Sequence, residues 1–263
     1  MRNALPRRAL SALLLPAAIP AMAAEDDHDI PVVHGTERIA FLLYPGFTAL
    51  DVFGPHNMLA GLMPERLDLV AATTEPVRTD TGIAITPTAT FDSVAPGLDV
   101  LCVPGGTTGT LAAMRDPAML AFLARHAPAT RFVTSVCTGS LVLGAAGLLR
   151  GRRATGHWVV RDLLALMGAT PVPDRVVEDG PVVTGAGVTA GMDFGLRLVA
   201  RMRSDAYAKA VQLIAEYAPE PPFDAGSPDR APPGITRQMR DMFAPFHADA
   251  RDAALVAARR LGL

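Results

Sequence analysis

Cys137 is the residue whose type and position most directly suggest chemistry. It lies between the apolar run 131–136, typical of a buried strand, and the small-residue run 139–149, typical of a helix packed on a sheet. A cysteine at such a junction faces the free amides of the helix start, whose partial positive charge lowers a thiol pKa. This placement is typical of a nucleophile elbow. The alternative is a small buried hydrophobic side chain, the usual role of a free cysteine, and the stretch alone does not decide between them.

Asp51 and a glycine pair are expected at the same edge of the sheet as the cysteine. Asp51 follows the first predicted strand, 38–44, and Gly105-Gly106 follow the predicted strand 98–103. In open sheets of parallel strands, functional residues gather outside the carboxyl ends of the strands, so these loops should converge. Paired glycines there also let backbone amides approach a ligand closely.

Together these residues could form an acid–base and anion-binding site. Asp51, if it faces Cys137, could donate or accept a proton. The backbone amides of Gly106 and Thr138 could bind a developing anion. Each residue also has a purely structural interpretation: a helix cap for Asp51, a turn for the glycines and a capping hydroxyl for Thr138.

The elements that must position these residues alternate along the chain. Apolar, β-branched segments are separated by segments with helical spacing, which argues for a mostly parallel sheet with helices on both faces. The predicted strands are 38–44, 66–73, 98–103, 131–136 and 152–155, with short strands or a hairpin within 74–93 and a hairpin of 174–178 and 182–184. The predicted helices run from Thr48 or Asp51 to about 62, over 110–126 with a break near Pro117, and over 139–149, 157–167, 188–202 and 205–217.

Length and composition limit the classes of function. With 263 residues, 50% of them hydrophobic, the chain can bury a large core, and it shows no internal repeat and no second domain of comparable size. A net charge of −2 implies no general affinity for nucleic acid or for an anionic membrane. No Cys or His cluster has metal-ligand spacing, so no metal is expected. Cys102 lies in a predicted central strand, and we expect no disulfide between it and Cys137.

Both ends of the chain differ from the middle. Residues 1–23 combine arginines, an apolar run and an Ala-Met-Ala pattern, which predicts a signal peptide followed by a flexible linker over 24–37. This implies a periplasmic or otherwise exported protein, with Arg7-Arg8 as a candidate twin-arginine signal; if the segment is not a true signal, the protein is cytoplasmic. The predicted C-terminal tail, 219–263, is rich in Pro, Gly, Ser and Asp up to 233 and carries one or two helices over 235–262.

Six segments of the chain form a recognisable ordered set. They are FLLYPGFTALDVFGP, VPGG, SVCTGSLVLGAAGLL, RRATGHW, VTGAGVTAGMDFGL and EYAPEPPFDAGSP. This set resembles the DJ-1/PfpI (ThiJ/PfpI) superfamily and, within it, the isonitrile hydratase branch, from about residue 38 to 230. The resemblance implies a DJ-1/PfpI domain over 38–218. It also implies a flavodoxin-like three-layer α/β sandwich, similar to class I glutamine amidotransferases, with a nucleophile elbow.

The resemblance assigns roles residue by residue. Cys137 aligns with the nucleophile of the branch, Thr138 with a threonine implicated in catalysis, and Asp51 with the carboxylate of the first loop. The oxyanion-type site of the family corresponds to Thr138 together with the loop Gly105-Gly106. A histidine that lies near the cysteine in several members corresponds to His157.

These assignments imply a cysteine-dependent hydro-lyase that hydrates isonitriles to N-substituted formamides without a cofactor, acts on a small molecule and forms a homodimer. A threonine rather than a histidine after Cys137 argues against the proteolytic activity of other members. Gly156 stands where relatives more often have threonine, which bears on substrate preference.

Other functions fit the same fold. One is a cofactor-free glyoxalase acting on 2-oxoaldehydes, and another is a non-catalytic redox-sensing or ligand-binding protein. The amino-terminal domains of AraC-type regulators share this fold, but they are followed by a basic helix-turn-helix region, for which too few residues follow 233 here. A signal peptide would also be incompatible with DNA binding.

Overall fold

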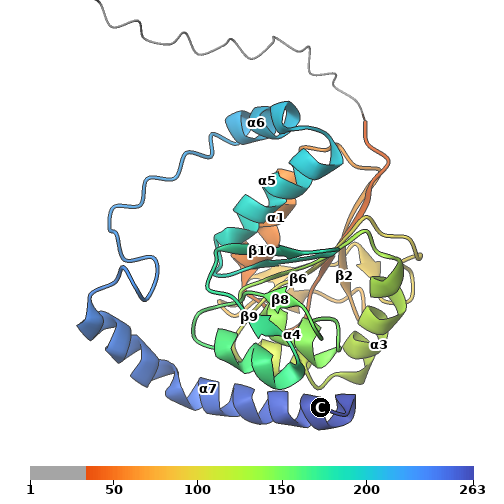
Figure 1. Ribbon diagram of the computed structural model, residues 1–263. Helices are drawn as coiled ribbons and strands as arrows, with labels where there is room; N and C mark the ends of the chain where they lie inside the picture. Colours follow the sequence, from red (N-terminus) through yellow and green to blue (C-terminus); the bar gives the residue numbers. More distant parts are fainter. Residues whose placement is uncertain (1–33) are drawn as a thin grey trace, which may run out of the picture. The chain divides into compact units, whose positions relative to one another are not determined.

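The computed structural model describes residues 34–263, which fall within one compact unit built on a seven-stranded sheet (Figure 1). The strand order is β10-β11-β7-β6-β1-β2-β5, and every neighbouring pair is parallel except β10 and β11. The strands are β1 (Arg38–Leu42), β2 (Arg66–Ala71), β5 (Ala89–Thr90), β6 (Val100–Val103), β7 (Phe132–Val136), β10 (Val176–Asp179) and β11 (Val182–Gly185). The predicted mostly parallel sheet is confirmed.

The centre of the sheet is buried on both faces. Strands β6, β7 and β11 are buried at every position, and β1 is buried at all but its first residue. Such strands consist mainly of apolar and β-branched residues because both faces pack against helices. The hydrophobic core therefore lies on both sides of the sheet.

Helices cover both faces, which gives the predicted three-layer sandwich (Figure 1). On one face α1 (Ala49–Ala60) packs against α5 (Ala190–Met202), and α5 packs against α6 (Asp205–Ile214). The other face carries α2 (Thr108–Ala113), α3 (Pro117–His126), α4 (Gly139–Ala145), the 3₁₀ helix η2 (Arg161–Met167) and α7 (Pro233–Leu261), with the short 3₁₀ turn η1 (Ala127–Ala129) following α3.

Most predicted boundaries hold to within a few residues. The break near Pro117 is confirmed, because Asp116 caps a new helix there by accepting the Ala118 N–H at 2.9 Å. The predicted hairpin around Gly180 is confirmed as β10 and β11. The helix predicted over 157–167 is instead a 3₁₀ helix that begins at Arg161. Its C-cap, Gly168, adopts a left-handed φ of 81°.

Two small sheets flank the main one. The segment 74–93 forms a hairpin of β3 (Val77–Arg78) and β4 (Ala84–Ile85) before it joins the main sheet at β5. Strand β8 (Arg153–Ala154) pairs in parallel with β9 (Thr170–Pro171), a strand that the sequence analysis does not predict. Strand β9 is two residues long, too short for a periodic signal.

The helical extension at the C-terminus is a single helix that packs on the domain. Helix α7 continues through Pro245 and contacts α4 and η2. Its buried side is a stripe of alanines with helical spacing, Ala250, Ala253, Ala254 and Ala257. Small side chains let this helix lie close to its neighbours, so the second half of α7 is part of the core. Between α6 and α7, residues 218–232 contain no helix or strand and stand away from the sheet (Figure 1).

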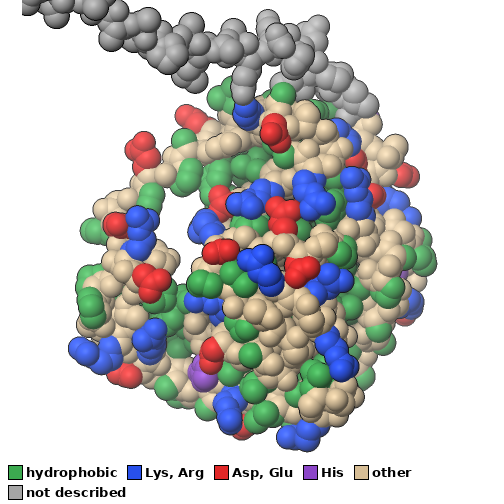
Figure 2. Space-filling model, viewed as in Figure 1, with side chains coloured by type: hydrophobic (Ala, Val, Ile, Leu, Met, Phe, Trp, Pro, Cys, Tyr) green, Lys and Arg blue, Asp and Glu red, His purple; other side chains and the backbone are tan. Residues whose placement is uncertain are grey.

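At the other end, the predicted signal peptide and most of the predicted linker lie outside the described residues. The last residue of that linker, Glu37, is 5% exposed and forms an ion pair with Arg203 at the end of α5. Acidic and basic side chains also lie side by side over α5, where Arg201 pairs with Glu178 (Figure 2). Within residues 34–263, no helix has the length and hydropathy needed to span a membrane.

Candidate active site

Cys137 lies at a strained turn between β7 and α4. Its φ is +58°, in the left-handed region that a cysteine rarely occupies, and strain of this kind persists where the surroundings fix the backbone. Its N–H donates to the Gly185 carbonyl at 3.1 Å, and its own carbonyl accepts the His157 N–H at 3.0 Å. The turn is therefore held from β11 on one side and from the loop after β8 on the other, as a nucleophile elbow requires.

Asp51 points into the site and does not cap its helix. Thr48 occupies the N-cap position without a side-chain capping bond, and Asp51 lies in the first turn, fully buried. Its Oδ2 accepts the Gly105 N–H at 2.7 Å. Its Oδ1 is buried without a well-oriented hydrogen-bond partner in the described residues, although the Cys137 thiol lies close enough to interact with the carboxyl.

Gly105 fits between the acid and the elbow only because it has no side chain. A Cβ at this position would lie 2.6 Å from the Thr138 nitrogen, 2.7 Å from its Oγ1 and 2.8 Å from Asp51 Oδ2. Real Cβ atoms essentially never approach that closely. The glycine therefore lets three chain segments, from α1, the loop after β6 and the elbow, converge on the cysteine, as the sequence predicts.

The thiol and the carboxyl both hold their protons more tightly than usual. Burial raises the pKa of Asp51 to about 7, and the Gly105 N–H offsets only part of that effect. Burial and the negative charge of Asp51 raise the pKa of Cys137 well above its usual value, against the lowering effect of the Thr138 amide. The predicted lowering of the thiol pKa by helix amides is thus outweighed, because the thiol is buried and lies beside the Asp51 carboxyl.

Thr138 belongs to a buried hydrogen-bond network. Its Oγ1 accepts the Gly106 N–H at 2.9 Å and lies 2.6 Å from the Gly106 carbonyl oxygen. The Thr110 hydroxyl reaches the same carbonyl at 2.7 Å and lies 2.7 Å from Thr138 Oγ1. Tyr44 donates to the Pro104 carbonyl at 2.6 Å and lies 3.3 Å from Thr110 Oγ1. These contacts fix the glycine loop against the elbow.

This network changes the predicted anion site. The Gly106 amide, predicted to bind an anion together with that of Thr138, is engaged by the Thr138 hydroxyl. The Thr138 amide does face the sulfur, since it lowers the pKa of Cys137. Sequence reasoning also misses Thr110 and Tyr44, because no local pattern marks side chains that meet only after α2 packs beside the elbow.

His157 contacts the cysteine through its backbone. Its ring packs instead against Trp158, at 5.8 Å between ring centroids, and edge-on against Phe243 of α7, at 6.4 Å. Burial lowers its pKa, with Arg161 acting in the same direction, so the ring favours the neutral form. The structure thus places His157 beside the elbow with its ring among aromatic side chains.

Gly156 lies against the elbow. A Cβ there would lie 2.2 Å from Ser140 Oγ and 3.1 Å from the Cys137 carbonyl oxygen. A threonine at this position would therefore require Ser140 to move.

The remaining cysteine is a core residue. Cys102 is fully buried in β6, and burial raises its pKa to about 12, so it stays a thiol. Both cysteines are free. In residues 34–263 no three His, Cys, Asp or Glu side chains are grouped so that they could hold a metal ion.

The fold and the elbow define a class of protein, and sequence comparison agrees. The chain belongs to the DJ-1/PfpI family, whose sequence profile matches residues 37–201. It is 50% identical over 208 residues to the isonitrile hydratase of Pseudomonas putida, and the aligned region covers 79% of this chain and 90% of that protein. It is 31% identical to the HTH-type transcriptional regulator GbdR of Pseudomonas aeruginosa, of which it spans only 52%.

Solved structures give the same result. A ThiJ/PfpI family protein from Pseudomonas syringae superposes with a TM-score of 0.84 at 48% identity, covering 91% of this chain and 98% of that one. Schizosaccharomyces pombe DJ-1, at 19% identity and a TM-score of 0.60, shares the fold over 70% of this chain. The predicted family and flavodoxin-like fold are confirmed.

Proposed function

We propose that this protein is an isonitrile hydratase-like hydro-lyase, with Cys137 as nucleophile and Asp51 as acid and base. One observation carries the proposal: a buried thiol lies beside a buried carboxyl whose pKa is raised to about 7. A carboxyl with that pKa can give and take a proton near neutral pH. The 50% identity to the Pseudomonas putida enzyme supports the choice of substrate class.

The first half-reaction adds the thiol across the terminal isonitrile carbon. Asp51 takes the Cys137 proton as the sulfur bonds to that carbon, and returns it to the same carbon, giving the thioimidate R–N=CH–S–Cys. The Thr138 amide faces the sulfur and stabilises the charge that develops there. Burial of both groups lets one proton pass between them without exchange with solvent.

The second half-reaction adds water and releases the product. Asp51 removes a proton from water as the oxygen bonds to the thioimidate carbon, and then passes that proton to the nitrogen. The tetrahedral adduct then loses Cys137 as the C–S bond breaks, and the hydroxyl proton returns through Asp51 to the sulfur. The product is the formamide R–NH–CHO, and the thiol is restored.

The test is incubation with cyclohexyl isocyanide and detection of N-cyclohexylformamide by mass spectrometry. We expect product from the wild type and none above background from Cys137→Ser, with Cys102→Ser, at the fully buried core cysteine, as the matched control. Absence of product from the wild type, or equal product from Cys137→Ser, would contradict the proposal. Lactate from methylglyoxal in a parallel assay would instead indicate the glyoxalase reaction.

We also propose that the protein is a homodimer and is exported by its N-terminal segment. Dimers are common in the family, and residues 1–23 have the composition of a signal peptide. Light scattering coupled to size exclusion would measure the mass of the assembly. Cell fractionation, with N-terminal sequencing of the mature protein, would locate it and show whether cleavage follows residue 23.

A further inference from the structure

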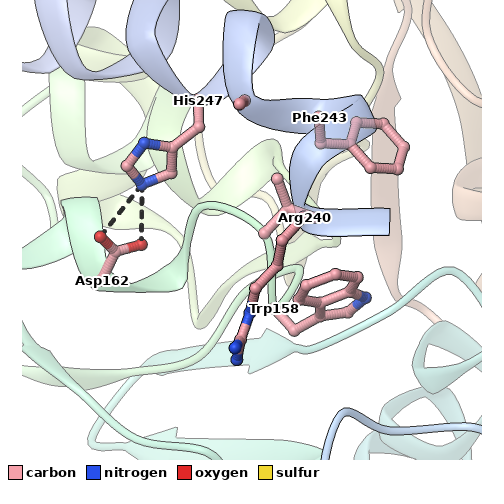
Figure 3. A pocket seen from close by; sticks show the side chains of 7 residues that line it. Trp158, Asp162, Arg240, Phe243 and His247 are labelled. Carbon is pink, nitrogen blue, oxygen red and sulfur yellow. Dashed lines mark hydrogen bonds and ion pairs between the residues drawn. The ribbon is translucent and has the colours of Figure 1, made fainter. Parts of the chain in front are cut away.

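A cavity lies between α7 and η2, near the elbow, and nothing in the proposed reaction uses it. It encloses about 420 Å³ and is lined by Trp158, Val159, Asp162, Arg240, Phe243, Ala244 and His247 (Figure 3). That volume is in the range of small-molecule sites, which are mostly apolar with a few oriented polar groups. Here two aromatic side chains supply the walls and three charged or titratable ones the polar groups.

Two of those three polar groups satisfy each other. His247 Nε2 lies 3.1 Å from Asp162 Oδ2, and Figure 3 shows the two side chains facing one another across one end of the cavity. Arg240 differs, because its guanidinium forms no hydrogen bond or ion pair with any described residue. It extends beside Trp158 (Figure 3). The cavity therefore offers one free planar cation next to an aromatic surface.

The cavity is connected to the elbow through His157. The His157 ring contacts both Trp158 and Phe243, which line the cavity, while its N–H holds the Cys137 carbonyl at 3.0 Å. Burial lowers the pKa of His157, so this ring adds no cation of its own near neutral pH. A bound molecule would thus be separated from the backbone of the nucleophile by one residue.

We propose that this cavity binds a small molecule that carries a carboxylate on a flat ring. Arg240 would hold the carboxylate through two parallel N–H···O bonds, a geometry that guanidinium groups favour. Trp158 and Phe243 would pack against the ring. The ligand has two possible sources. One is the substituent of the isonitrile substrate, and this source rests on the proposed function. The other is a separate carboxylate that acts on the enzyme from this cavity.

Trp158 provides a direct probe, because it is the single tryptophan of the chain. Titration of the full-length protein with benzoate should change its fluorescence, and benzamide, the neutral analogue, should bind at least about tenfold more weakly, the cost of losing a hydrogen-bonded charge. Arg240→Gln should weaken benzoate binding about tenfold. Arg237→Gln, on the same helix but not in the cavity wall, is the matched control and should leave it unchanged.

Calorimetry repeats the measurement without relying on fluorescence. Three outcomes would each contradict the proposed binding site. The first is no heat and no fluorescence change up to millimolar benzoate, the second is equal affinity for benzoate and benzamide, and the third is unchanged benzoate affinity in Arg240→Gln.

Kinetics distinguish the two sources of the ligand. If the cavity holds the substituent of the substrate, Arg240→Gln should raise KM for 4-isocyanobenzoate about tenfold while KM for cyclohexyl isocyanide is unchanged, and benzoate should inhibit competitively. If the carboxylate is separate, benzoate should alter kcat without competing. Should neither isocyanide be hydrated, the proposed function fails while the benzoate titration still decides the binding site.

Discussion

The elbow and the cavity beside α7 use polar groups in opposite ways. Around Cys137 the polar groups are buried and most are partnered; among the described residues Asp51 Oδ1 and the hydroxyls of Ser135 and Thr155 are the exceptions. In the cavity the polar groups reach solvent, with the Asp162 side chain 66% and the His247 side chain 35% exposed, and Arg240 has no hydrogen-bond or ion-pair partner within residues 34–263. A dry network fixes geometry and shifts pKa values, whereas an open one leaves a charge available to a ligand. The first arrangement suits bond making, and the second suits recognition.

The largest expected effect comes from the pKa of Asp51. In the unfolded chain this carboxyl ionises near its usual pKa of 3.8, while in the folded protein it keeps its proton up to about pH 7. The folded state therefore binds more protons between these values, and stability falls as pH rises through them. Asp51→Asn removes this cost, so the variant should gain stability relative to wild type as pH rises, by up to about 4 kcal/mol above pH 7.

Chemical denaturation at pH 5 and pH 8 measures this gain. The difference in unfolding free energy between Asp51→Asn and wild type is measured at each pH, and the two differences are compared. A change in packing caused by the substitution does not depend on pH, so it cancels in this comparison. An equal difference in unfolding free energy at both pH values would show that Asp51 is ionised throughout and would weaken its assignment as an acid.

Gly105→Ala should give the next largest effect. The added methyl would lie under 3 Å from the backbone of the elbow and from the Asp51 carboxylate, so the loop after β6 must shift. Overpacking of this kind costs about 1–3 kcal/mol, and the shift should also break the Asp51–Gly105 bond and abolish turnover. Gly226→Ala, where no atom lies within 4 Å, is the matched control for unfolding free energy.

The site around Gly105 shows which features can be predicted from the sequence and which cannot. Placing Asp51, Gly105 and Cys137 at one sheet edge follows from strand order alone, because the carboxyl ends of parallel strands meet there. The direction of the Cys137 pKa does not follow, since it depends on how completely α1 and the glycine loop exclude water. The surroundings of the His157 ring do not follow either, because its aromatic neighbour Phe243 on α7 is distant in sequence.

The fold was more predictable than the network for a related reason. The break at Pro117 and the turn at Gly180 are local signals. Thr110 and Thr138 instead meet through helix packing, and a threonine in a helix carries no sign of the partner its hydroxyl will find.

Thr110→Val tests whether that network controls the nucleophile. Each threonine has one hydroxyl proton, and both oxygens lie within reach of the Gly106 carbonyl. When Thr110 donates to this carbonyl, the Thr138 hydroxyl is free to donate to Cys137, an interaction that lowers the thiol pKa. Valine has the same shape without the hydroxyl, so Thr138 must satisfy the carbonyl alone.

We expect Thr110→Val to slow alkylation of Cys137 by iodoacetamide about tenfold and to move its pH profile upward, since a hydrogen bond to a charged group is worth about 1.5 kcal/mol or more. Thr110→Ser should restore the rate. Thr130→Val is the control, because it removes a buried threonine hydroxyl that donates to the His126 carbonyl, outside this network. An unchanged pH profile in the valine variant would mean that Thr138 does not donate to the sulfur.

The smallest effect is expected where the cavity meets solvent. Asp162→Asn removes the charge that faces His247. The pair contributes little to stability, because it is exposed to solvent and because the two side chains lose conformational entropy when they pair. The unfolding free energy should fall by less than about 1 kcal/mol, and the loss should shrink further in high salt. Denaturation with and without added NaCl measures both. A loss as large as that of Gly105→Ala would show that this end of the cavity is as tightly built as the elbow, and the contrast between an open recognition region and a closed reaction site would fail.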